Sequence, residues 1–159
     1  MGQCLSDYYL NKKDNTNTDL YTLEGLVLRA KVVDVYDGDT CTVVFKLNKR
    51  YEKHKVRMYG YDSPEMKPSR SDPNRDEIKK KAKYAKKLLE EKILNKIIIL
   101  RCGKWDKYGR LLGTIYVEGG CLSKNENVNE WMVDNNLGSN CFSYSYSTLR
   151  INKNERKRK

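Results

Sequence analysis

The clearest structural pattern in this chain is LVLRAKVVDVYDGDTCTVVFKL, which runs from Leu26 to Leu47. The segment is rich in β-branched residues, and apolar residues alternate with polar ones on both sides of Asp37-Gly38. Alternation with a period of two is typical of a half-buried strand, and Asp-Gly is a frequent turn pair. The segment therefore predicts a β-hairpin with DGDT, Asp37–Thr40, at its bend.

Three further strands are expected downstream of this hairpin. The segment HKVRMYGY at 54–61 follows a polar stretch and predicts the third strand. The segments Lys96–Cys102 and Leu111–Val117 predict the fourth and fifth, around a turn that contains KWDKYGR. All three prolines of the chain fall in one loop after the third strand, and that loop is long enough to be functional.

Two amphipathic helices and a short third one are expected as well. Asn74 and Glu77 form a capping-box pattern, which predicts the start of a helix of about four to five turns. Its apolar residues recur at helical spacing: Ile78, Ala82, Ala85, Leu89 and Ile93. Asn127 opens a second helix that Gly138 closes, and SYSYSTLR at 143–150 suggests the third.

The order of these elements predicts the fold class. Five strands, with one helix between the third and the fourth, suggest a small Greek-key barrel of the OB type. We therefore expect an α+β, β-rich fold: a five-stranded OB-fold barrel with about three helices. The domain is expected to cover residues 25–150, after a flexible leader at 1–24 and before a basic tail at 151–159.

The composition is that of a small, well-charged globular domain, and we expect a monomer. The 159 residues carry a net charge of +11, which favours a phosphate polymer or an anionic membrane as partner, although a basic surface can also serve solubility alone. Five cysteines without a C-x-x-C spacing, and no signal-peptide pattern, favour a reducing, cytoplasmic setting. No apolar run approaches the ~18 to 20 residues of a membrane span.

Three short segments place charged residues at strand ends or turns, where a rigid barrel can direct them at one point. They are DGDT with Asp39, VRMYGYDSPE with Arg57, Asp62 and Glu65, and WDKYGR with Arg110. A hard cation such as Ca²⁺ takes oxygen ligands. Two aspartates on separate turns, the Ser63 carbonyl and water would provide them.

Glu65 and two arginines would complete a hydrolytic site. Pro64 keeps the loop extended, so the longer Glu65 side chain would reach a water molecule and act as a general base. Arg57 and Arg110 are permanently charged planar forks that suit phosphate oxygens.

Simpler interpretations of the same residues stay open at this point. Asp-Gly is a common hairpin turn, Tyr-Gly is a common tight turn, and Arg57 with Asp62 would also make a surface ion pair of under about 1 kcal/mol. Arg57 and Asp62 are an odd number of residues apart, so strand alternation puts them on opposite sides unless Gly60 resets the path.

Taken together, the three segments resemble the staphylococcal nuclease family, whose pattern is D-G-D-T, then R followed five residues later by D-[ST]-P-E, then D-K-Y-G-R. This chain has Asp37–Thr40, Arg57 with Asp62–Glu65, and Asp106–Arg110 in that order. The segment VNEWMVDNNLG, Val128–Gly138, is similar to the helix V-N-x-x-L-V-x-x-G-L of that family.

The resemblance implies an OB-fold barrel and calcium-dependent hydrolysis of phosphodiester bonds in DNA and RNA. By motif position it implies that Asp39, Asp62 and the Ser63 carbonyl bind Ca²⁺, that Glu65 activates water, and that Arg57 and Arg110 hold the phosphate. Further candidates for contact with nucleic acid are Lys107, Tyr108, Tyr144 and Tyr146; of these, Tyr144 or Tyr146 would stack on a base as a tyrosine of that family does.

A different class of function is also compatible with the sequence. A catalytically silent OB module would bind nucleic acid or a protein partner without turnover, but Glu65 and Arg110 are intact, which argues against it. The preference among DNA, RNA, single strands and double strands has no signature in the sequence.

The leader carries a lipidation pattern. MGQCLS fits N-myristoylation at Gly2 with Ser6, and Cys4 stands where a second acyl chain is commonly added. One myristoyl chain binds membranes only marginally, so a stable anchor would need acylation of Cys4 or a basic patch, and Lys12 and Lys13 offer little of the latter. A peripheral membrane association is therefore expected only where the host modifies both residues.

Overall fold

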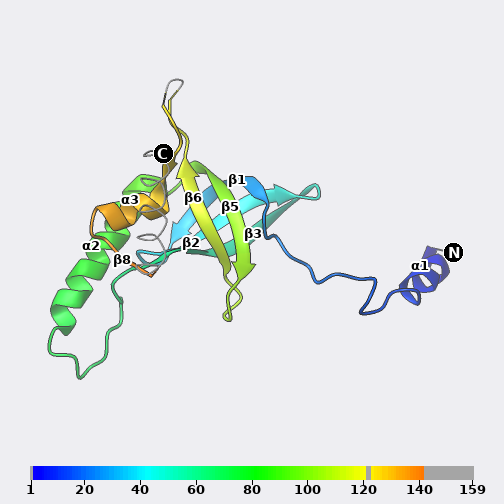
Figure 1. Cartoon of the computed structure of the whole chain (residues 1–159), viewed down its shortest axis with the longest axis horizontal. Coiled ribbons are helices and arrows are strands. Elements are labelled where there is room, and N and C mark those ends of the chain that lie inside the picture. Colours follow the sequence, from blue (N-terminus) through cyan, green and yellow to red (C-terminus); the bar gives the residue numbers. More distant parts are fainter. Residues whose placement is uncertain (1, 121–122, 142–159) are drawn as a thin grey trace, which may run out of the picture.

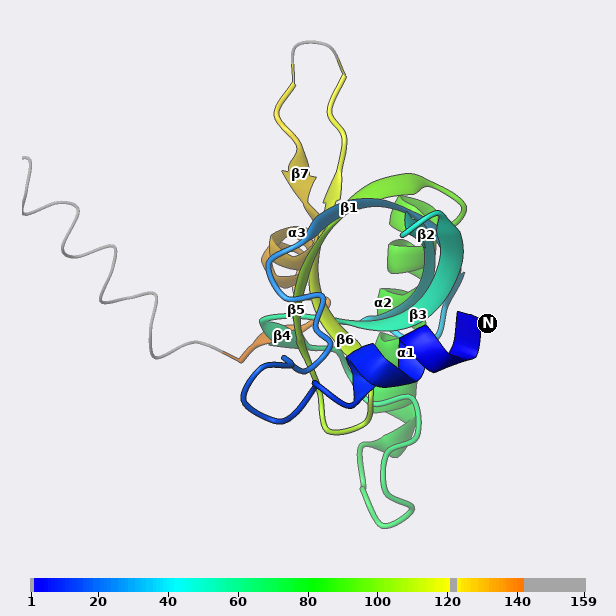
Figure 2. The ribbon, with the colours of Figure 1, turned by 90° about the vertical axis from the view of Figure 1, so that its right-hand side faces the viewer.

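The computed structural model describes residues 2–120 and 123–141. Five long strands form a closed barrel, which Figure 2 shows along its axis (Figures 1 and 2). They are β1 (Val27–Val35), β2 (Thr40–Leu47), β3 (Arg50–Met58), β5 (Ile97–Trp105) and β6 (Leu111–Val117). Neighbours pair antiparallel in the order β3-β2-β1-β5-β6, and a parallel pairing of β3 with β6 closes the barrel. The expected β-rich α+β fold with an OB-type barrel is confirmed.

The β1–β2 hairpin forms as predicted. Val35 pairs with Cys41 at its end, and DGDT makes the bend. A bulge between Val32 and Asp34 shifts the alternation by one residue. As a result Val35 is buried and Asp34 is exposed, which keeps the charge out of the core.

Strand β3 begins earlier than the sequence pattern predicts, at Arg50 rather than at His54. Asn48 and Lys49 form the preceding turn with φ angles of 46° and 70°. Two consecutive left-handed residues are typical of a tight two-residue hairpin turn. Lysine is an uncommon residue in that conformation, so this polar stretch carries no clear turn signal.

Helix α2 (Arg75–Ile93) packs on the barrel with one face, as predicted, and contacts β1. Its buried residues are Ala82, Ala85, Leu89 and Ile93. The capping-box prediction is wrong in detail, because Asn74 stands at the N-cap but its side chain makes no capping hydrogen bond. The acidic first turn, with Asp76 and Glu77, is favourable at the positive end of the helix dipole.

Helix α3 (Val128–Asp134) begins as predicted, because the Asn127 side chain accepts hydrogen bonds from two N–H groups of the first turn. The predicted end is wrong. Asn136, with φ 57°, takes the left-handed position after the helix. A Cβ atom at Gly138 would lie 2.4 Å from the Tyr61 ring, so packing, and not capping, requires glycine there.

Three very short strands complete the described fold. Strand β4 (Tyr61–Asp62) pairs with β8 (Ser139–Asn140), and β7 (Glu126–Asn127) extends the sheet beside β6. Two-residue strands are too short for a sequence pattern. The β4–β8 pair ties the chain after α3 to the segment that carries Asp62.

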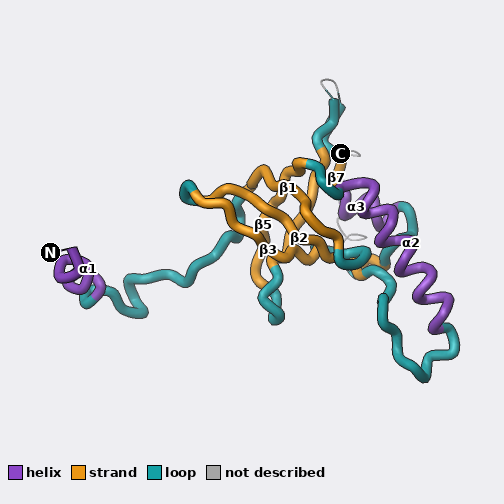
Figure 3. Tube along the Cα trace, turned by 180° about the vertical axis from the view of Figure 1, so that it is seen from behind, coloured by secondary structure: helices purple, strands orange, loops and turns teal. Residues whose placement is uncertain are grey.

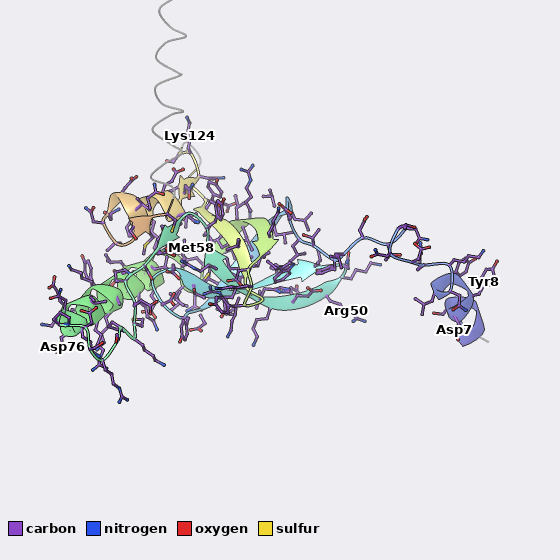
Figure 4. The ribbon with its side chains drawn as sticks, turned by 60° about the horizontal axis from the view of Figure 1, so that its bottom comes forward. Asp7, Tyr8, Arg50, Met58, Asp76 and Lys124 are labelled. Atoms are coloured by element: carbon purple, nitrogen blue, oxygen red, sulfur yellow. The ribbon has the colours of Figure 1, made fainter. Side chains whose placement is uncertain are left out.

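The leader, which we expected to be flexible, contains helix α1 (Gly2–Leu10). Figures 1 and 3 show α1 away from the barrel, on the side opposite α2 and α3. In Figure 4, Asp7 and Tyr8 mark this helix, whereas Met58 lies at the barrel. The chain reaches the core at Leu23, which is 1% exposed, so packing begins slightly before the predicted start of the fold.

Some predictions fall outside these observations. The surroundings of Gly2 and the side chain of Cys4 are not among the described features, so acylation stays a prediction. The expected third helix at 143–150, Tyr144, Tyr146 and the basic tail lie outside the described residues. Within the described part of the chain, no helix is long and apolar enough to span a bilayer.

Asn129→Ala is expected to lower the free energy of unfolding by about 3 kcal/mol. The buried amide of Asn129 donates to the carbonyls of Tyr59 and Gly113 at 2.8 and 3.1 Å, and its oxygen accepts from the N–H of Ile115 at 3.0 Å. Without it, backbone groups of β6 and of the turn after β3 lose a partner. Denaturant unfolding measures the loss, and the exposed Asn135→Ala variant is the control. Equal losses in both variants would contradict the explanation.

Candidate active site

The barrel register brings the three charged segments together. Thr40, next to Asp39, pairs with Arg57 across β2 and β3. Arg57 pairs in turn with Leu112, two residues after Arg110, where β3 meets β6. Directly paired residues have Cβ atoms about 5 Å apart. The closure of the barrel therefore explains why residues from three distant segments share one site.

Gly60 resolves the spacing problem between Arg57 and Asp62. It has φ 95°, a left-handed conformation that glycine adopts without strain, and it separates β3 from β4. The turn brings Asp62 back toward the strand that it follows, and the side chains of Arg57 and Asp62 form an ion pair. The condition set by strand alternation is thus met at Gly60.

Arg57 lies at the centre of the site, between two carboxylates. Its Nη1 atom is 2.7 Å from Oδ1 of Asp39, and its Nη2 atom donates to Asp62. The side chains of Arg57 and Asp39 are 15% and 10% exposed, but that of Asp62 is 63% exposed. The buried Nη1 is close enough to Asp39 for an ion pair, yet it makes no hydrogen bond. A guanidinium held between two carboxylates is fixed in orientation, and it carries five N–H donors in a planar fork.

Asp39 is held rigidly from several sides. Its Oδ2 atom accepts from the backbone N–H of Ser63 at 2.8 Å, and its Oδ1 atom accepts from the Thr40 hydroxyl at 3.0 Å. Its own carbonyl accepts from the N–H of Met58 at 2.7 Å. These contacts fix one carboxylate against the strand of Arg57 and against the loop after Asp62.

The two residues before Asp39 explain how the bend fits so tightly. A Cβ atom at Gly38 would lie 2.7 Å from the Cβ of Ser63 and 3.1 Å from that of Ala85. Only glycine therefore lets the bend pack against both the Ser63 loop and helix α2. Burial, and then the charge of Asp39, raise the pKa of Asp37 above its ordinary value, because the bend places two carboxyl groups close together.

Arg110 approaches the site from the turn between β5 and β6. Its Nε atom donates to Asp106 at 2.7 Å, and its Nη1 atom donates to the Thr40 hydroxyl at 3.3 Å. Partial desolvation acts to raise the pKa of Asp106, but hydrogen bonds from Arg110 and Tyr108 lower it below its ordinary value. Asp106 thus orients Arg110 toward the residue beside Asp39.

The other sequence candidates lie on the rim. Glu65 is exposed in the proline-containing loop, and it makes no hydrogen bond or ion pair with the residues that the structure describes. Lys107 and Tyr108 are exposed at the turn, with the lysine Nζ 5.0 Å from the Tyr108 ring centre. The Tyr108 ring also lies 5.4 Å from the guanidinium of Arg110. All three side chains are accessible to a large substrate.

Two contacts at the site have no signal in the sequence. The Cys141 thiol donates to Oδ2 of Asp62 at 2.9 Å, although the two residues are far apart in the chain. Burial, and then the contact with Asp62, raise the pKa of Cys141 to about 11, so the thiol is neutral near pH 7. The Tyr61 hydroxyl donates to the Gly38 carbonyl at 2.7 Å. Both contacts tighten the bend and the loop around Asp39.

The donor set fits a hard cation. Among the residues that the structure describes, no three His, Cys, Asp or Glu side chains converge in a metal-binding group. The Asp39 and Asp62 carboxylates nevertheless lie close together, because both contact one guanidinium. Two carboxylates with a backbone carbonyl and water suit Ca²⁺, which prefers oxygen ligands and accepts irregular geometry.

The comparison with protein families matches the family model described as staphylococcal nuclease homologue to residues 55–158, more than half of the chain. The matched range contains Arg57, Asp62, Ser63, Glu65 and Arg110, and it begins after the DGDT bend. A search of curated proteins found no match.

Proposed function

We propose that this chain, which belongs to the family of staphylococcal nuclease homologues, is a calcium-dependent nuclease that hydrolyses DNA or RNA with little sequence specificity. The observation that carries the proposal is the position of Arg57, whose guanidinium is fixed between the carboxylates of Asp39 and Asp62. Arg110 reaches the same region, because it donates to the hydroxyl of Thr40, the residue that follows Asp39. An anion-binding pair of arginines beside a pair of hard oxygen ligands suits a phosphodiester and a divalent cation.

The two arginines would hold the phosphate. Guanidinium groups match phosphate oxygens in a bidentate way, and a partly desolvated site strengthens such contacts. Arg57 is fixed by two carboxylates and Arg110 by Asp106, so neither needs to reorganise when charge grows on the phosphoryl oxygens. This preorganisation is usually the largest contribution to catalysis of such a reaction.

Asp39, Asp62 and the Ser63 carbonyl would hold Ca²⁺. When bound, the ion supplies positive charge that stabilises the additional negative charge on the phosphate. The protein prepares the site through the hydrogen bonds that Asp39 receives from Ser63 and Thr40. Asp62 is mostly exposed, which leaves one side of the carboxylate pair open to solvent and substrate.

Glu65 would act as the general base. Its exposed carboxylate has no competing partner among the described residues, so it can accept a proton from water. As the water oxygen bonds to phosphorus, its proton moves to a carboxylate oxygen of Glu65; the ester P–O bond breaks, and the leaving oxygen takes a proton from solvent to become a hydroxyl group. The loop with Pro64 and Pro68 restricts the backbone around it.

The test of this function is hydrolysis of single-stranded DNA, duplex DNA and RNA with Ca²⁺ or with a chelator. Cleavage that requires Ca²⁺ is expected for at least one substrate. Binding of nucleic acid with no cleavage in any metal would overturn the nuclease and support the silent OB module instead.

Asp62→Asn is expected to abolish most of the stabilisation that Ca²⁺ provides. A ligand at 100 times its Kd stabilises the folded state by about 2.7 kcal/mol, and loss of one of two carboxylate ligands should remove most of that. Asp62 is exposed, so the variant should fold normally without calcium. Thermal unfolding with and without Ca²⁺ measures the difference, and Asp76→Asn at the start of α2 is the control. An unchanged calcium response in Asp62→Asn would exclude this residue as a ligand.

A further inference from the structure

A groove lies on the sheet beside the strands that carry the candidate site. It has a volume of about 470 Å³ over strands β5 and β6, and its polar lining includes Glu24, Tyr59, Arg101, Lys104 and Thr114. None of these residues has a place in the site described above. Along β5 and β6, Arg101, Leu112 and Thr114 alternate with buried residues, so the groove lies on the outer face of the barrel.

The sheet register puts the groove one strand away from Arg57. Arg57 on β3 pairs with Leu112 on β6, which lines the groove. Strand β5 pairs with the other edge of β6, and its register shifts between Cys102 and Trp105. Gly103 and Lys104 therefore both lie opposite Leu112. Neighbouring strands are ~4.8 Å apart, which puts the backbone of Lys104 about 10 Å from that of Arg57.

The chemistry of the groove is that of a nucleic-acid channel. Arg101 and Lys104 are exposed, and neither forms an ion pair with another described residue. The Tyr59 side chain is 51% exposed on the same wall. Cations that follow a phosphate backbone, combined with an exposed aromatic ring, are the usual means of binding single strands without sequence preference. Gly103 also lines the groove, and it adds no side chain that would fill it.

We propose that this groove binds the single-stranded nucleic acid that continues from the phosphate held by Arg57 and Arg110. Arg101 and Lys104 contact successive phosphates of that strand, and Tyr59 supports a base. The span of about 10 Å corresponds to a few nucleotides, at about 3.4 Å per phosphate in a stacked strand. The placement of the nucleic-acid strand along the groove rests on the proposed function, since it is counted from the phosphate that Arg57 and Arg110 would hold. The affinity of the groove does not depend on hydrolysis.

Glu24 limits this channel at its far end. It is an exposed carboxylate that lines the same groove, and it repels a phosphate placed beside it. Its segment is held to β5, because the N–H of Gly25 donates to the Cys102 carbonyl at 2.9 Å. Glu24→Gln is therefore expected to tighten binding of a long strand, an effect opposite to that of losing Arg101 or Lys104.

The test compares a 12-nucleotide single strand with a trinucleotide, by fluorescence anisotropy and competition without Ca²⁺. Each phosphate contact is worth about 5-fold in affinity at 0.1 M salt and about 0.7 in the slope of log K against log salt. Arg101→Ala/Lys104→Ala is therefore expected to weaken binding of the 12-mer about 25-fold and to reduce the slope by about 1.4. Binding of the trinucleotide should change little.

The matched control is Lys80→Ala/Lys83→Ala, which removes the same charge from the exposed face of α2. An equal loss in this control, an equal loss for the trinucleotide, or no loss for the 12-mer would each overturn the inference. A larger loss for a 12-base-pair duplex than for the single strand would overturn the choice of occupant. Because the readout is binding, a protein that binds as expected but never cleaves would contradict only the proposed nuclease.

Discussion

Glu65→Gln is expected to lower kcat for nucleic-acid hydrolysis by about 10²- to 10⁴-fold, the usual contribution of a general base. The amide has nearly the same size and cannot accept the proton of the attacking water. Glu65 is exposed and has no hydrogen bond or ion pair in the described part of the chain, so folding should be unaffected. The arginines that would hold the phosphate are also unchanged, and KM should stay within a few-fold. Single-turnover cleavage separates the chemical step from binding.

The control for this variant is Glu130→Gln, an exposed glutamate in the first turn of α3. It should cleave at the rate of the unmodified protein, and both variants should unfold at the same temperature. If Glu65→Gln cleaves as fast as the control, the base is a different group and the role of Glu65 is wrong. A fall in affinity with unchanged kcat would instead assign Glu65 to substrate binding.

The strands were predictable from local patterns, whereas the details that build the site depend on tertiary contacts. The alternation in β1 and β2 reflects burial of one face, a property of the sequence itself. The turn at Asn48 and Lys49 has lysine where glycine usually follows asparagine, so the start of β3 was missed. A glycine at position 138 fits the sequence pattern of a helix cap, but the residue is required because a Cβ atom there would collide with the Tyr61 ring. Only the folded chain reveals that contact.

In the site too, local motifs were predictable and the tertiary contacts between them were not. Motif order identified Asp39, Arg57 and Asp62, but their spacing alone placed Arg57 and Asp62 on opposite sides. The left-handed Gly60 brings Arg57 and Asp62 together, and the parallel β3–β6 pairing brings the Arg110 segment next to Arg57. The Cys141 thiol on Asp62 and the Ser63 N–H on Asp39 join residues that share no local pattern. The groove with Arg101 was also missed, because its wall forms only when the barrel closes.

Arg57→Ala is expected to lower the free energy of unfolding by about 3 kcal/mol in the absence of metal and to abolish cleavage. The Arg57 and Asp39 side chains are 15% and 10% exposed, and removal of one partner of a buried pair leaves a charge without compensation. The cost comes mainly from Asp39, because Asp62 is solvated. Denaturant unfolding measures it. Arg29→Ala, which breaks the exposed pair with Glu118, is the control and should cost under about 1 kcal/mol.

The response to calcium distinguishes two roles of Arg57: compensation of the Asp39 and Asp62 charges, and binding of the phosphate. In the unmodified protein the guanidinium already neutralises Asp39 and Asp62, so a cation must share both carboxylates with it. In Arg57→Ala the carboxylates are uncompensated, and Ca²⁺ should therefore raise the unfolding temperature more than it does in the unmodified protein. Cleavage should not return, because the phosphate has lost its donor. Arg57→Lys, which keeps the charge without the planar fork, should recover much of the stability and little of the activity. An equal or smaller calcium response in Arg57→Ala would show that Asp39 and Asp62 do not bind the ion together.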